Sequence, residues 1–130
     1  MSLVHVVIGL ALVQCFIFSG LVGRARVKYE VPAPAMTGHP VFERYCRVHY
    51  NTLEQLVIFI PAMLLFGYYI SETWAALLGG VYIAARFLYL RGYVSDPAKR
   101  GPGFGLSMLP IIVLLLGGLG GALWSLFGQG

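Results

Sequence analysis

The chain alternates between long apolar runs and short polar connections, and this pattern predicts its secondary structure. The two ends, residues 1–23 and 101–130, contain no Asp, Glu, Lys or Arg. Two shorter runs without these charged residues, 55–71 and 73–85, lie between them and are separated only by Glu72. A helix of roughly 20 apolar residues crosses a hydrocarbon layer of about 30 Å, so each end is long enough to span a membrane.

These runs predict four transmembrane helices. Only α-helices and closed β-barrels satisfy their backbone polar groups in lipid. Runs such as 56–65 and 109–116 lack the polar alternation of a barrel strand. We therefore expect one all-α domain over residues 1–130, an integral-membrane four-helix bundle with up-down topology. The expected spans are residues 2–23, 44–70, 73–91 and 104–126.

Prolines and glycines mark the connections between the expected helices. Residues 29–40 contain three prolines and a glycine, a composition that cannot continue a helix. Residues 96–103 are interrupted in the same way. The turn at Ser71 and Glu72 is very short, so the second and third helices should be antiparallel neighbours. The glycines within residues 117–121 suit close contact between helices.

Composition and charge agree with a membrane protein. Hydrophobic residues make up 58% of the chain and charged residues 11%, whereas soluble domains average about 25% charged residues. The Lys and Arg residues flank the two long connections, which the positive-inside rule places in the cytoplasm, with both termini on the opposite side. A bacterial inner membrane and the endoplasmic reticulum both fit. Basic residues placed at helix ends, rather than spread with aromatics over a surface that faces water, do not indicate nucleic-acid binding.

The N-terminal span and the cysteines are expected to be structural features. No positive charge precedes the first span and its apolar stretch is long, so it should be retained rather than cleaved as a signal peptide. Cys15 lies within a span and Cys46 near the membrane surface. The pair predicts no disulfide framework and no metal site.

Polar residues form one stripe on each of the two central helices. On the second helix the spacing of three, four and three residues places the stripe on one face. The third helix has a stripe with spacing of four, three and four. We expect these two faces to meet. The stripes consist of Arg44, Arg47, Asn51 and Glu54, and of Tyr82, Arg86, Tyr89 and Tyr93.

Charged side chains at membrane depth are costly and tend to face a partner or a wet cavity. Arg44 and Arg91 are explained by reaching toward lipid phosphates. For Arg47, Glu54 and Arg86, two interpretations remain open, an internal Arg–Glu ion pair and a ligand site. Arginines, a carboxylate, an amide and tyrosine hydroxyls would suit a small zwitterion that carries more than one carboxylate.

Two sequence motifs resemble signatures of one family. Residues 42–54 read Phe-Glu-Arg-x-x-Arg-x-His-x-Asn-Thr-Leu-Glu, and residues 85–93 read Ala-Arg-x-x-Tyr-x-x-Gly-Tyr. They resemble motifs of the MAPEG family, the membrane-associated proteins in eicosanoid and glutathione metabolism. Ala-Arg at 25–26 and Asp-Pro-Ala-Lys-Arg at 96–100 lie at family-like distances. The first motif is most similar to the microsomal glutathione transferase branch, particularly type 3.

The resemblance implies a homotrimer that binds glutathione, as co-substrate, between protomers near the cytoplasmic side, with no metal. Arg100 matches the catalytic arginine, and a guanidinium beside the glutathione sulfur would stabilise its thiolate. Glu54 would receive the γ-glutamyl ammonium, and Tyr93 would donate either to a carboxylate or to the sulfur. The residues carried over as glutathione-binding are Arg26, Arg47, His49, Asn51, Glu54, Arg86, Tyr89 and Tyr93.

The function implied by the resemblance is a membrane-bound glutathione transferase with a role in detoxification. It would conjugate glutathione to apolar electrophiles that arrive from the lipid, and it would also reduce lipid hydroperoxides. Gln55 stands where the leukotriene-synthase branch has a tyrosine, and Lys99 offers a second cation beside Arg100. One alternative is a non-enzymatic lipid- or glutathione-binding protein of the same fold. Another is a small transporter or assembly subunit whose intramembrane charges line a pathway.

Overall fold

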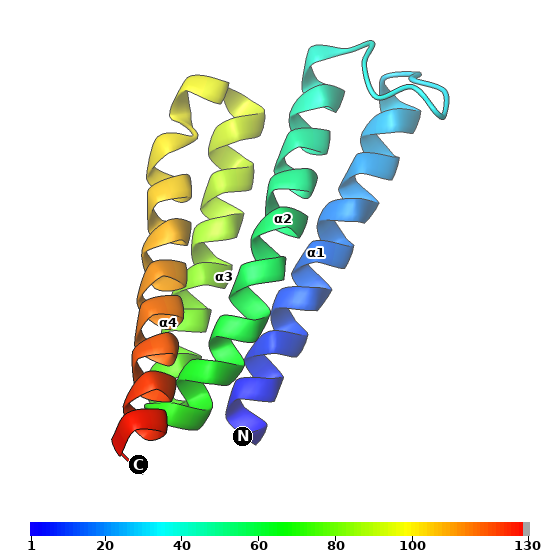
Figure 1. The fold of residues 1–130 in the computed structure, drawn as a ribbon. Coiled ribbons are helices and arrows are strands. Elements are labelled where there is room, and N and C mark those ends of the chain that lie inside the picture. Colours follow the sequence, from blue (N-terminus) through cyan, green and yellow to red (C-terminus); the bar gives the residue numbers. More distant parts are fainter. Residues whose placement is uncertain (129–130) are drawn as a thin grey trace.

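The computed structural model describes residues 1–128, which form four α-helices (Figure 1). A short 3-10 helix, η1, precedes the last of them. Each α-helix is long and apolar enough to cross a membrane. Consecutive helices run in opposite directions, which confirms the all-α, up-down, multi-pass membrane fold. The elements are α1 (Ser2–Lys28), α2 (Pro40–Tyr69), α3 (Glu72–Ser95), η1 (Pro97–Lys99) and α4 (Gly101–Gly128).

Helices α2 and α3 form the centre of the bundle. Helices α1 and α4 lie at opposite edges, and each packs on both α2 and α3. The main core draws on all four helices, with Val4, Phe59, Tyr82 and Leu114 almost fully buried. Many large apolar side chains point outward along the helices, which suits contact with lipid rather than with water.

The helices extend beyond the expected spans. Helix α1 continues to Lys28 and α3 to Ser95, whereas the sequence predicted ends at residues 23 and 91. Helix α2 begins at Pro40 instead of residue 44, because a proline at the first helical position loses no helical hydrogen bond. The side chain of His39 caps this end, with its Nδ1 accepting from the backbone N–H of Val41 at 3.2 Å. The predicted ends differ because a run without charged residues predicts only the part of a helix that crosses the hydrocarbon, whereas the helix itself can continue beyond it.

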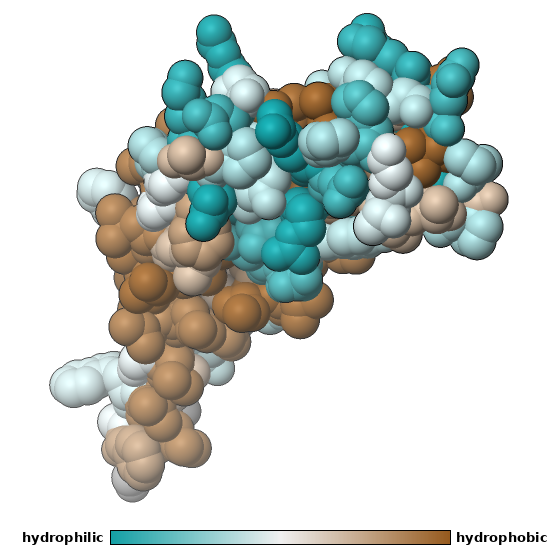
Figure 2. Space-filling model, turned by 90° about the horizontal axis from the view of Figure 1, so that it is seen from above, coloured by the Kyte–Doolittle hydropathy of each residue, from teal (hydrophilic) through white to brown (hydrophobic). Residues whose placement is uncertain are grey.

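The two long connections lie together at one end of the bundle, and residue 1 and the α2–α3 turn lie at the other (Figure 1). Figure 2 looks onto the end that holds the two connections. Hydrophilic residues gather over much of this end, with some hydrophobic ones among them, and hydrophobic residues make up most of the lower part of the view. Arg44 joins the parts of this polar end. Its Nη1 donates to the carbonyl of Val94 at 3.0 Å, which ties the start of α2 to the end of α3.

The glycines near the end of α4 allow it to approach α2 closely, as predicted. A Cβ atom on Gly118 would lie 2.8 Å from Cβ of Leu65 and 3.0 Å from the backbone N of Phe66. A Cβ on Gly117 or Gly121 would also press against α2. The Leu65 and Phe66 backbone cannot move aside as a flexible side chain would. The contact therefore depends on the absence of a side chain.

We predict that Gly118→Ala destabilises the bundle by about 1–3 kcal/mol, the usual cost of overpacking. Gly120→Ala is the matched control, since no atom lies within 4 Å of a Cβ built there. The control should leave stability unchanged or raise it slightly, because alanine favours a helix more than glycine does. Thermal unfolding of both variants in detergent checks the prediction. Equal melting temperatures for the two variants would contradict it.

Candidate functional site

A fully buried guanidinium lies at the centre of the site. Arg86 is 0% exposed and is held by three neutral side chains of α2. Its Nη2 donates to Asn51 Oδ1 and to Thr52 Oγ1, both at 2.8 Å. Its Nε donates to Thr52 Oγ1 at 3.2 Å and its Nη1 to Gln55 Oε1 at 2.9 Å. The guanidinium carbon also lies 4.3 Å from the centre of the Tyr89 ring.

Sequence reasoning missed Thr52 and Gln55 as partners of Arg86. Both lie on the buried face of α2, four and seven residues after buried Val48, a spacing that continues to Phe59. Two polar residues within an otherwise apolar stripe of α2 could have indicated that a buried polar group lies opposite them. The amide of Gln55 also donates to the sulfur of Met108 on α4 at 3.2 Å. The buried network therefore connects α2, α3 and α4.

The network fixes the orientation of the Asn51 amide. Asn51 is half-buried, and its Oδ1 accepts from Arg86, a group that has only donors to offer. The NH₂ group of the amide is consequently the end that remains for another partner. Asn51 thus presents hydrogen-bond donors beside the network, where a carboxylate or carbonyl oxygen would be the matching group.

Arg47 and Glu54 lie on the outer face of α2, and both are exposed. They are seven residues apart, and exposed Tyr50 lies between them on the same face. Neither forms an ion pair within residues 1–128, where the one ion pair joins the N-terminal ammonium to Glu72 at 2.8 Å. Within one copy of the chain, the described residues therefore do not form the internal Arg–Glu pair considered above.

The predicted meeting of the two polar stripes is confirmed only in part. The stripe on α3 faces inward as expected, with Tyr82, Arg86 and Tyr89 buried. Only part of the stripe on α2 faces α3, because the polar residues cover a wider arc of α2 than the surface that contacts α3. Asn51, at one flank of the arc, reaches Arg86, whereas Arg47 and Glu54 point away from the bundle.

Arg26 organises the first connection. Its Nη1 donates to the carbonyls of Ala35 at 2.8 Å and Val31 at 3.2 Å. Its guanidinium carbon lies 4.9 Å from the centre of the Phe42 ring, at the start of α2. The position that the family resemblance assigned to glutathione binding thus holds the α1–α2 loop against both helices.

Arg100 and its neighbour Lys99 are exposed at the corner between η1 and α4. The Nη1 of Arg100 donates to the carbonyl of Pro97 at 2.8 Å. Glycines hold this corner close to α3. A Cβ on Gly92 would lie 2.7 Å from the carbonyl oxygen of Lys99, and a Cβ on Gly103 would clash with the backbone of Tyr89. The corner is therefore positioned by backbone contact.

The remaining predicted residues lie between the buried network and the polar end. Tyr93 is half-buried, with its ring centre 5.5 Å from that of Tyr89. His49 is half-buried and its ring centre lies 5.8 Å from that of Tyr50. Among residues 1–128, no three His, Cys, Asp or Glu side chains gather closely enough to hold a metal ion.

Comparisons with known proteins agree with the motifs. An uncharacterised protein of Synechocystis sp. is 50% identical over 105 residues, which are 81% of this chain and 77% of that protein. Human microsomal glutathione S-transferase 2 is 44% identical over 104 residues, 79% of this chain and 71% of that protein. Bovine leukotriene C4 synthase is 37% identical over 83 residues, 64% of this chain and 55% of that protein.

The motifs pointed particularly to the type 3 branch, whereas the human relative bears the name of type 2. The assignment to type 3 stays a prediction. At the level of the family the match is extensive, because the MAPEG profile covers residues 4–120. It includes both polar stripes, the loop-binding Arg26 and the corner with Arg100. The chain therefore belongs to the MAPEG family.

Proposed function

We propose that this protein is a membrane-bound glutathione transferase that conjugates glutathione to apolar electrophiles. The observation that carries the proposal is the outer face of α2. There Arg47 and Glu54 are exposed without an ion-pair partner among residues 1–128, and the donors of Asn51 lie beside them. Relatives that bear the name of microsomal glutathione S-transferase support the choice of glutathione.

The charges of this face complement those of glutathione. The peptide has two carboxylates, one ammonium and one thiol. The planar guanidinium of Arg47 suits a bidentate contact with a carboxylate, and the carboxylate of Glu54 suits the γ-glutamyl ammonium. The Asn51 amide would donate to a second carboxylate or to a peptide carbonyl. His49, Tyr89 and Tyr93 complete the proposed binding set on the side nearest the polar end.

We place Arg86 and Arg26 differently from the other arginines of the proposed site. All three nitrogens of the Arg86 guanidinium donate within the chain, so it supports glutathione binding through Asn51. Arg26 acts beside the ligand and holds the loop with its Nη1. The proposed contacts with glutathione therefore come mainly from groups that the protomer leaves free.

A second copy of the chain would close the site. The outer face of α2 also exposes Leu53 and Val57, so covering it buries apolar surface as well as the ligand. Such closure strengthens the contacts with charged groups because it excludes water. We propose the homotrimer that the family resemblance implied, with glutathione between protomers. By the positive-inside rule the site faces the cytoplasm, in a bacterial inner membrane or the endoplasmic reticulum.

Arg100 is the proposed catalytic residue. Glutathione reacts as a thiolate, and a free thiol has a pKa of about 8.5. A guanidinium next to the sulfur favours the anion, and the released proton goes to water. The sulfur then attacks an electrophilic carbon, forms a C–S bond and expels the leaving group. With a lipid hydroperoxide it attacks the terminal oxygen instead. An S–O bond forms, the O–O bond breaks and the lipid alkoxide takes a proton from water, which gives a glutathione sulfenic acid and the lipid alcohol.

The direct test uses the purified full chain in detergent. Glutathione is titrated while thiolate absorbance is followed, and conjugation to a generic aryl halide is measured with hydroperoxide reduction in parallel. We expect saturable binding, a thiolate signal near neutral pH and turnover. Binding without turnover would instead support a non-enzymatic binding protein. If the folded protein showed no glutathione binding and no turnover, the proposal would be contradicted.

The same assay tests the role of Arg100. We expect Arg100→Gln to lower kcat by about a hundredfold, the usual effect of removing one group that stabilises a developing anion. The KM for glutathione should change little. Lys99→Gln is the matched control, because Lys99 is equally exposed at the same corner. If Lys99→Gln carried the loss of kcat and Arg100→Gln did not, the catalytic role would belong to Lys99.

Glu54→Gln distinguishes a ligand contact from a structural ion pair. Because Glu54 is exposed and forms no ion pair among residues 1–128, the substitution should leave the melting temperature unchanged. It should raise the Kd for glutathione at least about tenfold, since a charge-assisted hydrogen bond is lost. Calorimetric titration and thermal unfolding measure the two effects. A fall in melting temperature with unchanged affinity would give Glu54 a structural role.

Asn51→Asp and Thr52→Val should have opposite effects. Asn51→Asp keeps an acceptor for Arg86 and loses the donors, so we expect weaker glutathione binding with stability retained. Thr52→Val leaves buried donors of Arg86 unsatisfied and should cost about 1–3 kcal/mol of stability, with a smaller effect on binding. The same two measurements apply. Loss of stability in Asn51→Asp together with unchanged binding would show that Asn51 only supports the fold.

A further inference from the structure

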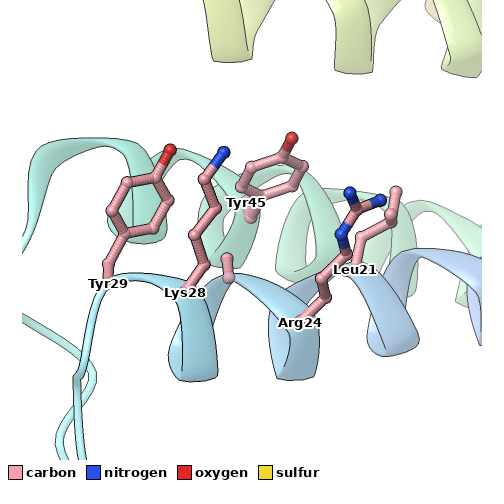
Figure 3. A pocket seen from close by; sticks show the side chains of 6 residues that line it. Leu21, Arg24, Lys28, Tyr29 and Tyr45 are labelled. Carbon is pink, nitrogen blue, oxygen red and sulfur yellow. The ribbon is translucent and has the colours of Figure 1, made fainter.

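A hollow of about 100 Å³ lies between α1 and α2 at the polar end of the bundle, apart from the proposed glutathione site. In Figure 3 the polar ends of Arg24, Lys28, Tyr29 and Tyr45 point to the same side of α1 and α2. It lies on the other side of α2 from Arg47, because Tyr45 and Arg47 are about 200° apart around the helix. It is lined by Leu21, Arg24, Ala25, Lys28, Tyr29 and Tyr45.

The polar groups of the hollow lack protein partners. Within residues 1–128, no side-chain hydrogen bond or ion pair involves Arg24 or the hydroxyls of Tyr29 and Tyr45. The ammonium of Lys28 lies 5.4 Å from the centre of the Tyr29 ring. None of the six lining residues is acidic. Two cations and two phenol hydroxyls therefore line one open side of the hollow, where a small anion would find donors and positive charge.

The depth of the hollow matches the phosphate level of a bilayer. Arg24 is the first charged side chain of α1, which is helical from Ser2 onward. At 1.5 Å per residue, residues 2–24 extend roughly 33 Å, close to the hydrocarbon thickness of about 30 Å. Arg24 thus lies where α1 leaves the hydrocarbon. Lys28, one turn further, lies among the headgroups.

An apolar stripe leads from the hollow along the outside of α1. Its members lie 7, 11, 14 and 18 residues before Arg24, which places them on the same face of the helix. All are exposed, between 45% and 58%. A free phosphate ion would gain nothing from such a stripe, whereas a lipid acyl chain would lie against it. The stripe consists of Val6, Leu10, Val13 and Ile17.

We propose that this hollow binds the phosphate of an anionic phospholipid, with an acyl chain along the α1 stripe. Arg24 contacts the phosphate oxygens through its planar guanidinium, and the Tyr29 and Tyr45 hydroxyls donate to them. Lys28 adds a second positive charge. The ammonium of a zwitterionic headgroup would be repelled by these cations, so lipids with a net negative headgroup are preferred. The proposal is independent of glutathione binding.

The test measures binding of phosphatidylglycerol to the purified full chain by native mass spectrometry, with phosphatidylcholine as the reference lipid. We expect a lower Kd for phosphatidylglycerol. Arg24→Gln should raise that Kd about tenfold, and Tyr45→Phe roughly two- to tenfold, since each removes a donor to the phosphate. The matched controls are Arg91→Gln, which removes an exposed cation at the same end of the bundle, and Tyr68→Phe, an exposed phenol on α2.

The controls separate a built site from general attraction between basic residues and anionic headgroups. Equal effects of Arg24→Gln and Arg91→Gln, with none from Tyr45→Phe, would overturn the proposal, because a hydroxyl contributes only through a specific contact. The proposal would also be overturned if inorganic phosphate displaced phosphatidylglycerol, or if glutathione did so at the concentration at which glutathione binds the protein. The occupant of the hollow would then be a soluble anion. Glutathione affinity should be the same in Arg24→Gln and the wild-type chain.

Discussion

The guanidinium of Arg86 is the group on which the packing of the central helices depends. A cation in a membrane-spanning segment costs a few kcal/mol unless its donors find acceptors. Here every nitrogen of the guanidinium donates to α2, and the Tyr89 ring covers one face. The register of α3 against α2 is thereby specified by directional bonds, in a bundle whose other contacts are mostly apolar.

Because Arg86 needs acceptors from α2, the polar residues of α2 fall into two groups, those that face Arg86 and those that face outward. Thr52 and Gln55 turn inward and satisfy Arg86, and Gln55 passes the connection to Met108 of α4. Arg47 and Glu54 lie on the outer face of α2 and form no ion pair within residues 1–128. A helix that supplies both the internal acceptors and the external charges can hold a binding surface rigidly, because each half of its circumference has one role.

Much of this architecture was readable from the sequence, and the failures have physical causes. Missing charges located four spans, since charge is costly in lipid, but helices α1 and α3 continue into the headgroup region where charge is tolerated. Helical spacing correctly placed Arg86 inward. It could not show that Asn51 reaches Arg86 while Glu54 is exposed, because the spacing of polar residues does not show which edge of their arc faces the neighbouring helix. Arg26 stays a predicted glutathione-binding residue, but its bonds to loop carbonyls could not be predicted, because they depend on a fold of residues 31–36 that has no periodic signature.

Gly92 of α3 and Gly103 of α4 have a consequence for motion, because they bring the corner of η1 and α4 against α3. Where main chain rests directly on main chain, as at Gly92 and Gly103, a segment has little freedom to tilt or slide. The main chain at Arg100 is therefore held close to α3, and its exposed side chain extends from there with Nη1 donating to the Pro97 carbonyl at 2.8 Å. From a segment held in this way, the exposed guanidinium of Arg100 can reach only a limited volume. Its reach then sets how near the polar end a reacting sulfur must lie.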